Sequence, residues 1–273
     1  MKIINLIEDT VGVPGLHAEH GLSIYVETDR HKILADTGAG AKTWENAAHL
    51  GVEIGEVDTV FLSHGHYDHG GGILSFVRRN PDALLWLHQT AGHAYYNLKE
   101  NREKYIGIDW DILALSQCIR LGTGYYRLDE ELSIFSGAAG RRKWPGSNRT
   151  LKCKEGGRFR QDTFAHEQYL IVRAEGKTVL LSGCAHNGIL NILDRYQEVC
   201  GDLPHLVISG FHMMKKEAYE KEEIELIKET ARELRETGIL FYTGHCTGLP
   251  AFEIMREIMG DRLRYMHCGD RIL

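Results

Sequence analysis

The chain has 273 residues, with 32 Lys and Arg against 38 Asp and Glu, and its formal net charge is −6. Its 43% hydrophobic and 26% charged residues are typical of a globular protein with a sizeable core, which excludes disordered, collagen-like and coiled-coil classes. The acidic balance also argues against a general binder of polyanions, so no nucleic-acid partner is expected.

The histidines are the unusual part of the composition. There are 15 of them, and His is the commonest ligand of transition metals. The six cysteines include no C-x-x-C pair, which predicts reduced thiols in a chain of this size. No stretch reaches the roughly 18 apolar residues of a membrane span, and residues 1–10 lack the pattern of a signal peptide. We therefore expect a cytoplasmic protein without a membrane partner.

The N-terminal half is predicted to alternate strands and helices. Strands are expected at 2–6, 22–27, 31–35, 59–62 and 83–87, and helices at 41–50 and 91–99. The strand at 59–62 runs directly into the segment SHGHYDHGGG at 63–72. A strand followed by a glycine-rich turn and a helix is where α/β proteins often place their chemistry.

The C-terminal half continues in the same way. Strands are predicted at 118–121, 132–135, 169–174, 178–181, 206–209, 239–242 and 263–266, and helices at 187–199, at 217–236 and from Pro250 onward. No repeat, low-complexity run or linker interrupts the chain, which predicts one domain over residues 1–273. Two strand-rich halves that each carry helices suggest sheets packed face to face with helices outside.

The segment from His64 to His69 predicts a metal site. In an extended stretch, alternate side chains point the same way, so His64 and His66 can hold one ion from one side. Asp68 and His69, at the turn into the following helix, then face a second position. Imidazole and carboxylate ligands favour Zn²⁺ first, with Fe or Mn as alternatives. A histidine-rich surface loop is the competing interpretation.

This segment resembles the H-x-H-x-D-H signature of the metallo-β-lactamase superfamily. The turn at 36–38, Ser182-Gly183 and Gly244-His245 follow in the order of that superfamily. More narrowly, the chain resembles the branch of 7,8-dihydropterin-6-methyl-4-(β-D-ribofuranosyl)aminobenzene-5′-phosphate synthase-like proteins. The motifs that carry this narrower resemblance are EHGLS at 19–23, the segment 63–72, GCAHNG at 183–188, GFH at 210–212 and GHCTG at 244–248.

The resemblance implies a mixed α/β fold, a four-layer αββα sandwich, with one or two divalent metal ions at the edge between two sheets. It implies that His64, His66 and His186 hold one ion, and that Asp68, His69 and His245 hold the other. The alternative for His186 is a histidine at a helix start with no metal, and His245 has a similar alternative.

The chain departs from the superfamily at one position. Many members carry an Asp that bridges both ions after the strand ending in Gly183, and this chain has Cys184 there. A thiolate at Cys184 could ligate a soft metal, or Cys184 could be a small buried residue beside a site without a bridge. His212 could replace the missing ligand, contact the substrate or only form a hydrogen bond near a strand end.

Three further sets of residues are expected around this site. Asp36 is expected to accept a hydrogen bond from a ligand imidazole and fix its tautomer, with a structural turn residue as the alternative. His20, in the loop after the first strand, could reach the pocket or be an ordinary loop histidine. Arg141 and Arg142 begin a basic segment at 141–160, which could steer an anionic substrate or be a solvated connection.

A bound metal of this kind lowers the pKa of water from about 15.7 to near 7, so hydrolysis is the first functional expectation. Asp68 and His212 are the residues expected to act in catalysis on a small, anionic substrate that bears a phosphate or a pterin. The narrower resemblance implies a second class, a synthase that joins a dihydropterin diphosphate to an aminobenzene ribofuranosyl phosphate and releases diphosphate. A noncatalytic binder of metal or pterin is the third class, and the oligomeric state is left open.

Overall fold

In the computed structural model, which describes residues 1–99 and 102–273, the chain forms two units with separate sheets. The first unit comprises Met1–Thr123, Thr150–Gln168 and Met266–Leu273, and the second comprises Gly124–Arg149 and Tyr169–Tyr265. Each unit therefore draws on distant parts of the sequence. The single domain expected over residues 1–273 stays a prediction.

The main sheet of the first unit has six strands in the order β1-β2-β3-β4-β5-β8. Their bounds are Lys2–Ile7, Ser23–Glu27, Lys32–Ala35, Thr59–Phe61, Leu84–His88 and Cys118–Leu121. The first three strands pair antiparallel, whereas β3, β4, β5 and β8 pair parallel. The carboxyl ends of the parallel strands therefore meet at one edge of the sheet.

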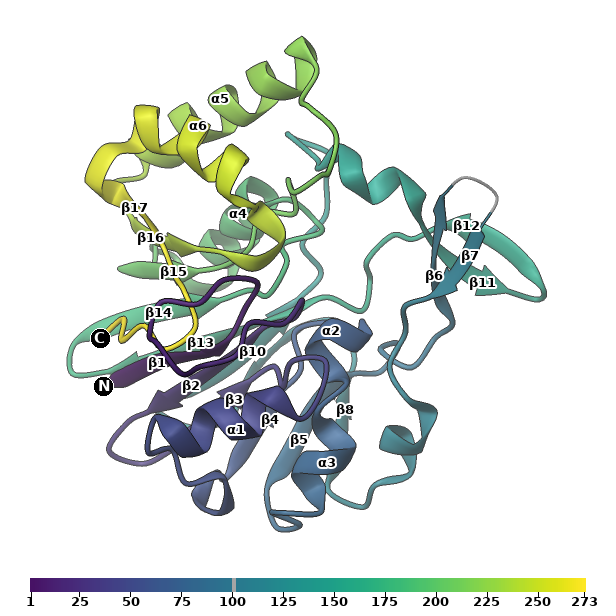
Figure 1. The fold of residues 1–273 in the computed structure, drawn as a ribbon, viewed down its shortest axis with the longest axis vertical. Coiled ribbons are helices and arrows are strands. Elements are labelled where there is room, and N and C mark those ends of the chain that lie inside the picture. Colours follow the sequence, from purple (N-terminus) through teal and green to yellow (C-terminus); the bar gives the residue numbers. More distant parts are fainter. Residues whose placement is uncertain (100–101) are drawn as a thin grey trace. The chain divides into compact units, whose positions relative to one another are not determined.

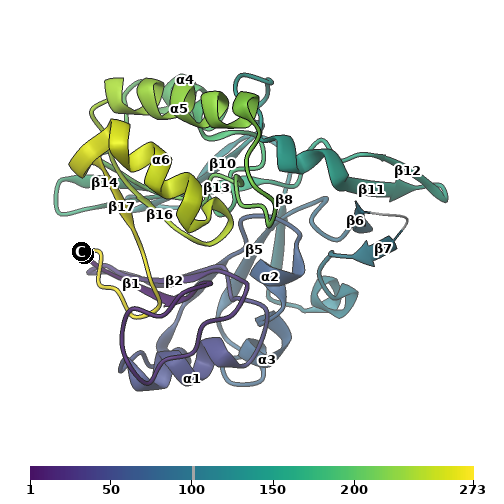
Figure 2. The same cartoon turned by 45° about the horizontal axis from the view of Figure 1, so that its top comes forward.

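Three short helices accompany this sheet: α1 (Lys42–His49), α2 (Tyr67–Gly70) and α3 (Ile73–Val77). Figures 1 and 2 show α1 and α3 on the same face of the strands. The core on that face combines Trp44 and Ala47 of α1 and Phe76 of α3 with apolar strand residues such as Leu34 and Leu85. This packing fixes the loops that emerge at the carboxyl ends of β3 and β4.

A second sheet of the first unit corrects one prediction. Residues 91–99, expected as a helix, contain the strand β6 (Tyr95–Lys99), which pairs with β7 (Arg102–Tyr105) and with β11 (Leu151–Glu155). The strand β12 (Arg158–Gln161) completes the order β12-β11-β6-β7. Tyr95 and Tyr96 favour a strand, and the pairing partner β11 lies too far along the chain for a local pattern to reveal it.

The sheet of the second unit has seven strands in the order β17-β16-β15-β14-β13-β10-β9. Their bounds are Leu263–Tyr265, Leu240–Thr243, Leu206–Ile208, Lys177–Leu181, Gln168–Ala174, Leu132–Ser136 and Tyr125–Arg127. The strands β14, β15, β16 and β17 pair parallel. As in the first unit, consecutive parallel strands deliver their following loops to one edge.

Helices α4 (Ile189–Cys200), α5 (Lys221–Glu236) and α6 (Leu249–Met259) belong to the second unit. Figure 1 shows α5 and α6 running side by side. Helix α5 contributes Ile227, Ala231 and Leu234 to the core. The helix begins at Lys221 and not at 217, because Glu220 and Glu223 form a capping box.

Five short 3₁₀ helices complete the described elements: η1 (Ile54–Glu56), η2 (Trp110–Ala114), η3 (Gly146–Thr150), η4 (His245–Thr247) and η5 (Gly260–Arg262). Within residues 1–99 and 102–273, no helix combines the length and the apolar character needed to cross a membrane.

Candidate metal centre

The histidine-rich loop of the first unit lies at the carboxyl edge of its parallel strands. Asp36 follows β3, and His64 to His69 follow β4. Because β3 and β4 are neighbours in the sheet, their following residues are brought to the same place. The sheet topology thus explains why a turn near residue 36 meets a motif about thirty residues later.

Three imidazoles of this loop are packed against one another. The ring centroid of His64 lies 4.5 Å from that of His66 and 4.1 Å from that of His69. His64 and His69 are fully buried, His66 is 4% exposed and Asp68 is 8% exposed. Burying three imidazoles and a carboxylate together is costly unless they have partners or bind a cation.

Asp36 organises this cluster. Its Oδ1 accepts a hydrogen bond from the Ser63 amide at 2.7 Å, and its Oδ2 accepts from Ser63 Oγ at 2.7 Å. The same Oδ2 lies 2.6 Å from His69 Nδ1, the contact that the sequence predicts for Asp36. When His69 donates from Nδ1 to this carboxylate, its Nε2 carries the lone pair that a metal requires.

His64 is oriented in the same manner. Its Nδ1 lies 2.9 Å from Ser63 Oγ, and that hydroxyl already donates its proton to Asp36. His64 must therefore donate from Nδ1, which leaves its Nε2 as an acceptor. Two imidazoles of the cluster consequently present the same kind of lone pair.

His66 is held in its neutral form. Burial, reinforced by the neighbouring His166, lowers the pKa of His66 to about 3. An imidazole with such a pKa is uncharged at neutral pH. The uncharged ring is the form that ligates divalent metals.

His166, between β12 and β13, contacts this loop and is not predicted from the sequence. The amide of Gly65, between two of the predicted ligands, donates to His166 Nδ1 at 2.8 Å. His166 Nε2 lies 3.2 Å from Asp162, and its ring stacks on Tyr95 with centroids 4.0 Å apart. Its only local signal is an Asp four residues earlier, since its partner Gly65 is 101 positions away.

His20 reaches the same part of the first unit. Its Nδ1 lies 2.7 Å from Asp9, and its Nε2 lies 3.5 Å from Asp68. The His20 side chain is 46% exposed. It therefore lies between the buried Asp68 carboxylate and solvent.

The second unit carries its own cluster of candidate ligands, again at the ends of parallel strands. Cys184 and His186 follow β14, His212 follows β15, and His245 follows β16. Nitrogen or sulfur atoms of Cys184, His186 and His212 all lie within 4.8 Å of one another. Those of Cys184, His245 and Cys246 form a second such group.

Asn148 orients His186 in this cluster and was not predicted. Its side-chain amide donates to the His186 carbonyl at 2.8 Å, and its Oδ1 lies 2.9 Å from His186 Nδ1. Because this oxygen can only accept, His186 donates from Nδ1 and presents Nε2 as a lone pair. Asn148 comes from η3, and its amide is the local equivalent of the carboxylate that orients His69.

The main chain is strained at four positions in or beside the two clusters of candidate ligands. Asp36, Ala185, His212 and His245 have φ angles of 62°, 54°, 49° and 47°. Such angles in residues other than Gly cost about 1–3 kcal/mol each and gather at functional sites.

Cys246 has an unusual thiol. Its burial raises the pKa, but hydrogen bonds with Cys184 and His212 and the nearby His245 lower the pKa of Cys246 well below its usual range. By contrast, burial raises the pKa of Cys268 to about 12. The environment of Cys246 therefore favours a thiolate, which is the nucleophilic and metal-binding form.

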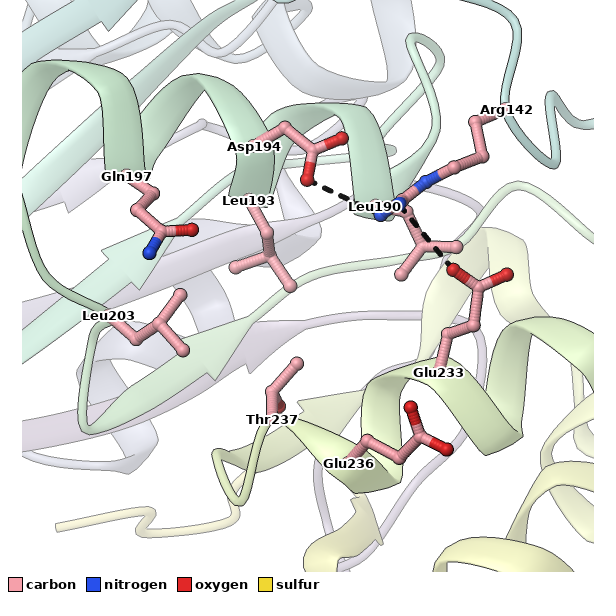
Figure 3. A pocket seen from close by; sticks show the side chains of 9 residues that line it. All are labelled: Arg142, Leu190, Leu193, Asp194, Gln197, Leu203, Glu233, Glu236 and Thr237. Carbon is pink, nitrogen blue, oxygen red and sulfur yellow. Dashed lines mark hydrogen bonds and ion pairs between the residues drawn. The ribbon is translucent and has the colours of Figure 1, made fainter.

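The two predicted substrate arginines lie in the second unit. The guanidinium of Arg141 stacks 4.2 Å above the ring of Trp144. Arg142 pairs with Asp194 at 3.3 Å and with Glu233 at 3.6 Å. Figure 3 shows these pairs in a pocket that Glu236 also lines, so the charge of Arg142 is already met by carboxylates. The substrate role of both arginines stays a prediction.

Both clusters fit divalent cations chemically. The first unit brings together His64, His66, Asp68, His69, Asp36 and His20, and the second brings together Cys184, His186, His212 and His245. Neutral imidazoles whose Nδ1 atoms are engaged, with carboxylate or thiolate beside them, are the donors that Zn²⁺ prefers. The identity and number of the ions stay predictions.

Comparison with known proteins identifies relatives along the whole chain. The family model described as the metallo-beta-lactamase superfamily matches residues 18–160. A 7,8-dihydropterin-6-methyl-4-(beta-D-ribofuranosyl)-aminobenzene-5′-phosphate synthase of Methanocaldococcus jannaschii is 29% identical over 98% of this chain and 95% of its own length. These matches confirm both levels of the resemblance predicted from the motifs.

Solved structures agree with this relationship. A metal-dependent hydrolase of the beta-lactamase superfamily is 28% identical, covers 100% of this chain and 98% of its own, and superposes with a TM-score of 0.82. Zn²⁺-bound PqqB from Methylobacterium extorquens, at 13% identity and full coverage of both chains, shares the fold with a TM-score of 0.55. The predicted mixed α/β fold of the superfamily is confirmed, and the stacking into four layers stays a prediction.

Proposed function

Because the chain belongs to the metallo-β-lactamase superfamily, we propose that it is a metal-dependent hydrolase acting on a small, anionic substrate. The observation that carries the proposal is the buried cluster of His64, His66 and His69, in which Asp36 and Ser63 leave the Nε2 atoms of His64 and His69 as acceptors. Such a cluster has the donor atoms of a metal site, and its polar rings are poorly suited to packing an apolar core.

The proposed ligands are those expected from the sequence: His64, His66, Asp68 and His69 of the first unit, with His186 and His245 of the second. One or two divalent ions are proposed, with Zn²⁺ first and Fe or Mn as alternatives. A divalent cation held by such ligands acts as a Lewis acid and lowers the pKa of water to about 7.

Residues of the chain would supply the remaining chemistry. The half-exposed imidazole of His20, 3.5 Å from Asp68, can carry a proton between the buried carboxylate and solvent. His212, whose Nδ1 is buried without a hydrogen-bond partner among the described residues, can donate to or accept from a substrate atom. Asp68 and His212 therefore remain the proposed catalytic residues.

The small sheet of the first unit supports a substrate with a flat ring and negative charge. Tyr96 contacts Tyr105 and Phe159 edge to face, and Lys154 lies 4.7 Å above Phe159. We call these four residues the aromatic–lysine face. Aromatic rings stack on flat heterocycles, and lysines attract anions.

This sheet is continuous with the loop of proposed ligands. The amide of Tyr67, next to His66, donates to the Ile106 carbonyl at 2.9 Å. The Tyr67 hydroxyl accepts a hydrogen bond from Lys104 Nζ at 3.1 Å. A substrate held on the aromatic–lysine face would thus be bound by the same unit that carries the histidine cluster.

Arg141 and Arg142 are the other residues proposed to contact the substrate. If they do, charge reversal of both raises KM for anionic substrates more than for neutral ones. Equal effects on the two kinds of substrate would remove both arginines from the proposal.

The relative from Methanocaldococcus jannaschii supports a second candidate. That relative is named as a synthase, and a synthase-like transferase would join a dihydropterin diphosphate to an aminobenzene ribofuranosyl phosphate. In that reaction the metal would assist the departure of diphosphate, and no water would be consumed. The same ligands and the same aromatic–lysine face would serve it.

Metal analysis followed by a turnover screen tests both candidates. Protein purified without chelators is assayed for bound metals and then incubated with phosphoesters, lactones and pterin diphosphates in ¹⁸O-labelled water. Solvent oxygen in a product of one substrate supports the hydrolase, and diphosphate released in a two-substrate reaction supports the transferase. Tight pterin or metal binding without turnover under Zn, Fe or Mn would replace both with a noncatalytic binder.

A further inference from the structure

Two cysteine thiols meet at the carboxyl edge of the sheet in the second unit. Cys184 follows β14 and Cys246 follows β16, the two strands that flank β15. Their Sγ atoms and a ring nitrogen of His245 all lie within 4.8 Å of one another. Cys246 Sγ is also 3.6 Å from the carbonyl oxygen of Cys184, and both residues are buried.

The surroundings of this thiol pair differ from those of a structural cysteine. Cys268, also buried, accepts a hydrogen bond from the Glu8 amide at 3.1 Å and donates one to the Glu8 carbonyl at 3.2 Å. Cys246 instead lies among potential ligands. The main chain makes room for its sulfur, because a Cβ at Gly210 would lie only 2.4 Å from Cys246 Sγ.

His212 adds a nitrogen donor to the pair. Its ring lies 4.1 Å from that of His186 between centroids, and a ring nitrogen of His212 lies within 4.8 Å of Cys184 Sγ. Its Nδ1 is buried and lacks a hydrogen-bond partner within residues 1–99 and 102–273. The left-handed φ of 49° at His212 keeps the imidazole in this position at a cost in backbone energy.

We propose that Cys184 and Cys246, together with His212, are ligands of a thiophilic divalent cation. In this arrangement His212 binds the cation in place of the substrate contact proposed for it above. Two sulfurs and an imidazole favour Zn²⁺ over the harder Mn²⁺ and Mg²⁺. On binding, any proton that either sulfur still carries is released to solvent, and each sulfur forms a bond to the metal. The inference deepens the proposed function and rests on it, because it names the sulfur ligands that take the place of the bridging Asp and so determine which metal is bound.

Cobalt spectroscopy of the full-length protein tests this inference. Metal-free protein, kept reduced with a phosphine, is titrated with Co²⁺, and bound cobalt is measured by elemental analysis. We expect an intense near-ultraviolet charge-transfer band from sulfur to cobalt in the unmodified protein. Cys184→Ser and Cys246→Ser should each keep about half of that band, and the double variant should lose it, because each thiolate contributes separately.

Cys200→Ser is the matched control, since Cys200 lies in the same unit but at the end of α4, where it accepts a hydrogen bond from Arg173. Its cobalt spectrum should equal that of the unmodified protein. A His212→Ala variant should keep the band but bind cobalt at least 10-fold more weakly, by loss of one nitrogen ligand.

The outcomes separate the inference from the proposed function. Cobalt bound without the near-ultraviolet band would overturn the thiolate assignment and leave metal binding intact. A band that survives in the double variant would also overturn it. Failure of the reduced protein to bind Co²⁺, Zn²⁺ or Mn²⁺ would instead refute the proposed function itself. The spectrum of the unmodified protein decides the matter even if a variant does not fold.

Discussion

Asp36 carries a negative charge into a buried site, and replacing it with Asn should weaken metal binding. The Asp36 side chain is 2% exposed, and its two oxygens accept three hydrogen bonds, from the Ser63 amide, Ser63 Oγ and His69 Nδ1. An Asn keeps the shape and the oxygen that faces the Ser63 amide. It places an NH₂ group, a donor, where Oδ2 accepts from two donors.

The Asp36→Asn change therefore forces His69 to reverse its tautomer. With a donor opposite Nδ1, the imidazole keeps its lone pair there and carries its proton on Nε2, where a metal would bind. Loss of such an orienting carboxylate typically lowers metal affinity about 10–100-fold, which corresponds to roughly 1.4–2.7 kcal/mol. Loss of the charged hydrogen bond to His69 should also destabilise the metal-free protein by about 1.5–3 kcal/mol.

Competition with a chromophoric chelator measures the Zn²⁺ affinity, and urea unfolding of the metal-free protein measures the stability. Asp261→Asn is the control, because it also removes one negative charge, from a side chain that is 97% exposed and whose ion-pair partner is Arg256. Unchanged Zn²⁺ affinity in Asp36→Asn would refute the tautomer argument. Reduced stability with unchanged affinity would make Asp36 a structural turn residue.

Three further outcomes follow from the first unit. His66→Ala should lose bound metal and turnover together, while His49→Ala, at the exposed end of α1, should keep both; retention of full metal content in His66→Ala would contradict its assignment as a ligand. His166→Leu should lower kcat and metal affinity, because the amide of Gly65 loses its hydrogen-bond acceptor. His166→Asn restores an oxygen near that amide and should recover most of the loss. Equal effects of the two variants would exclude the hydrogen bond as the cause. Burial, with smaller effects of His166 and His93, lowers the pKa of His88 to about 4, so the unfolded chain binds more protons than the folded chain between about pH 6.5 and pH 4. The free energy of unfolding should therefore fall by up to about 3 kcal/mol as the pH drops through this window. Urea unfolding of His88→Gln should show a correspondingly flatter pH dependence, and an identical slope in both proteins would refute the contribution of His88.

The sequence predicts the parts of this structure that depend on neighbours in the chain. The strand at 59–62 and the glycines after His69 are local signals, and the structure has β4 and the loop close to where they were expected. The helix expected at 217–236 is another local signal, since its core residues Ile227, Ala231 and Leu234 recur at steps of three and four residues. Such features depend on periodicity and turn chemistry, which a single sequence displays.

Features that depend on pairing across the chain escaped the sequence. The helix predicted at 91–99 is wrong because β6 forms by pairing with β11, which lies more than fifty residues away, whereas Ala94, Leu98 and Lys99 do not themselves favour a strand. His166 and Asn148 were missed for the same reason. Each orients a loop through a hydrogen bond that spans 101 or 38 positions, and neither stands in a recognisable motif.

The hydrogen-bond partners that orient the imidazoles differ in chemical character. This difference predicts which ligands determine the affinity for a metal and which determine the choice of metal. His69 is bonded to a carboxylate, His64 to a hydroxyl and His186 to an amide. A carboxylate raises the basicity of an imidazole more than a neutral partner does, so the ligands of the first unit should contribute most to affinity. Sulfur ligands determine selectivity, because thiolates prefer soft cations. The Asp36 and Cys184 variants should therefore have different effects. Asp36→Asn should lower the affinity for all divalent metals by the same factor, whereas Cys184→Ser should reduce the ratio of Zn²⁺ affinity to Mn²⁺ affinity.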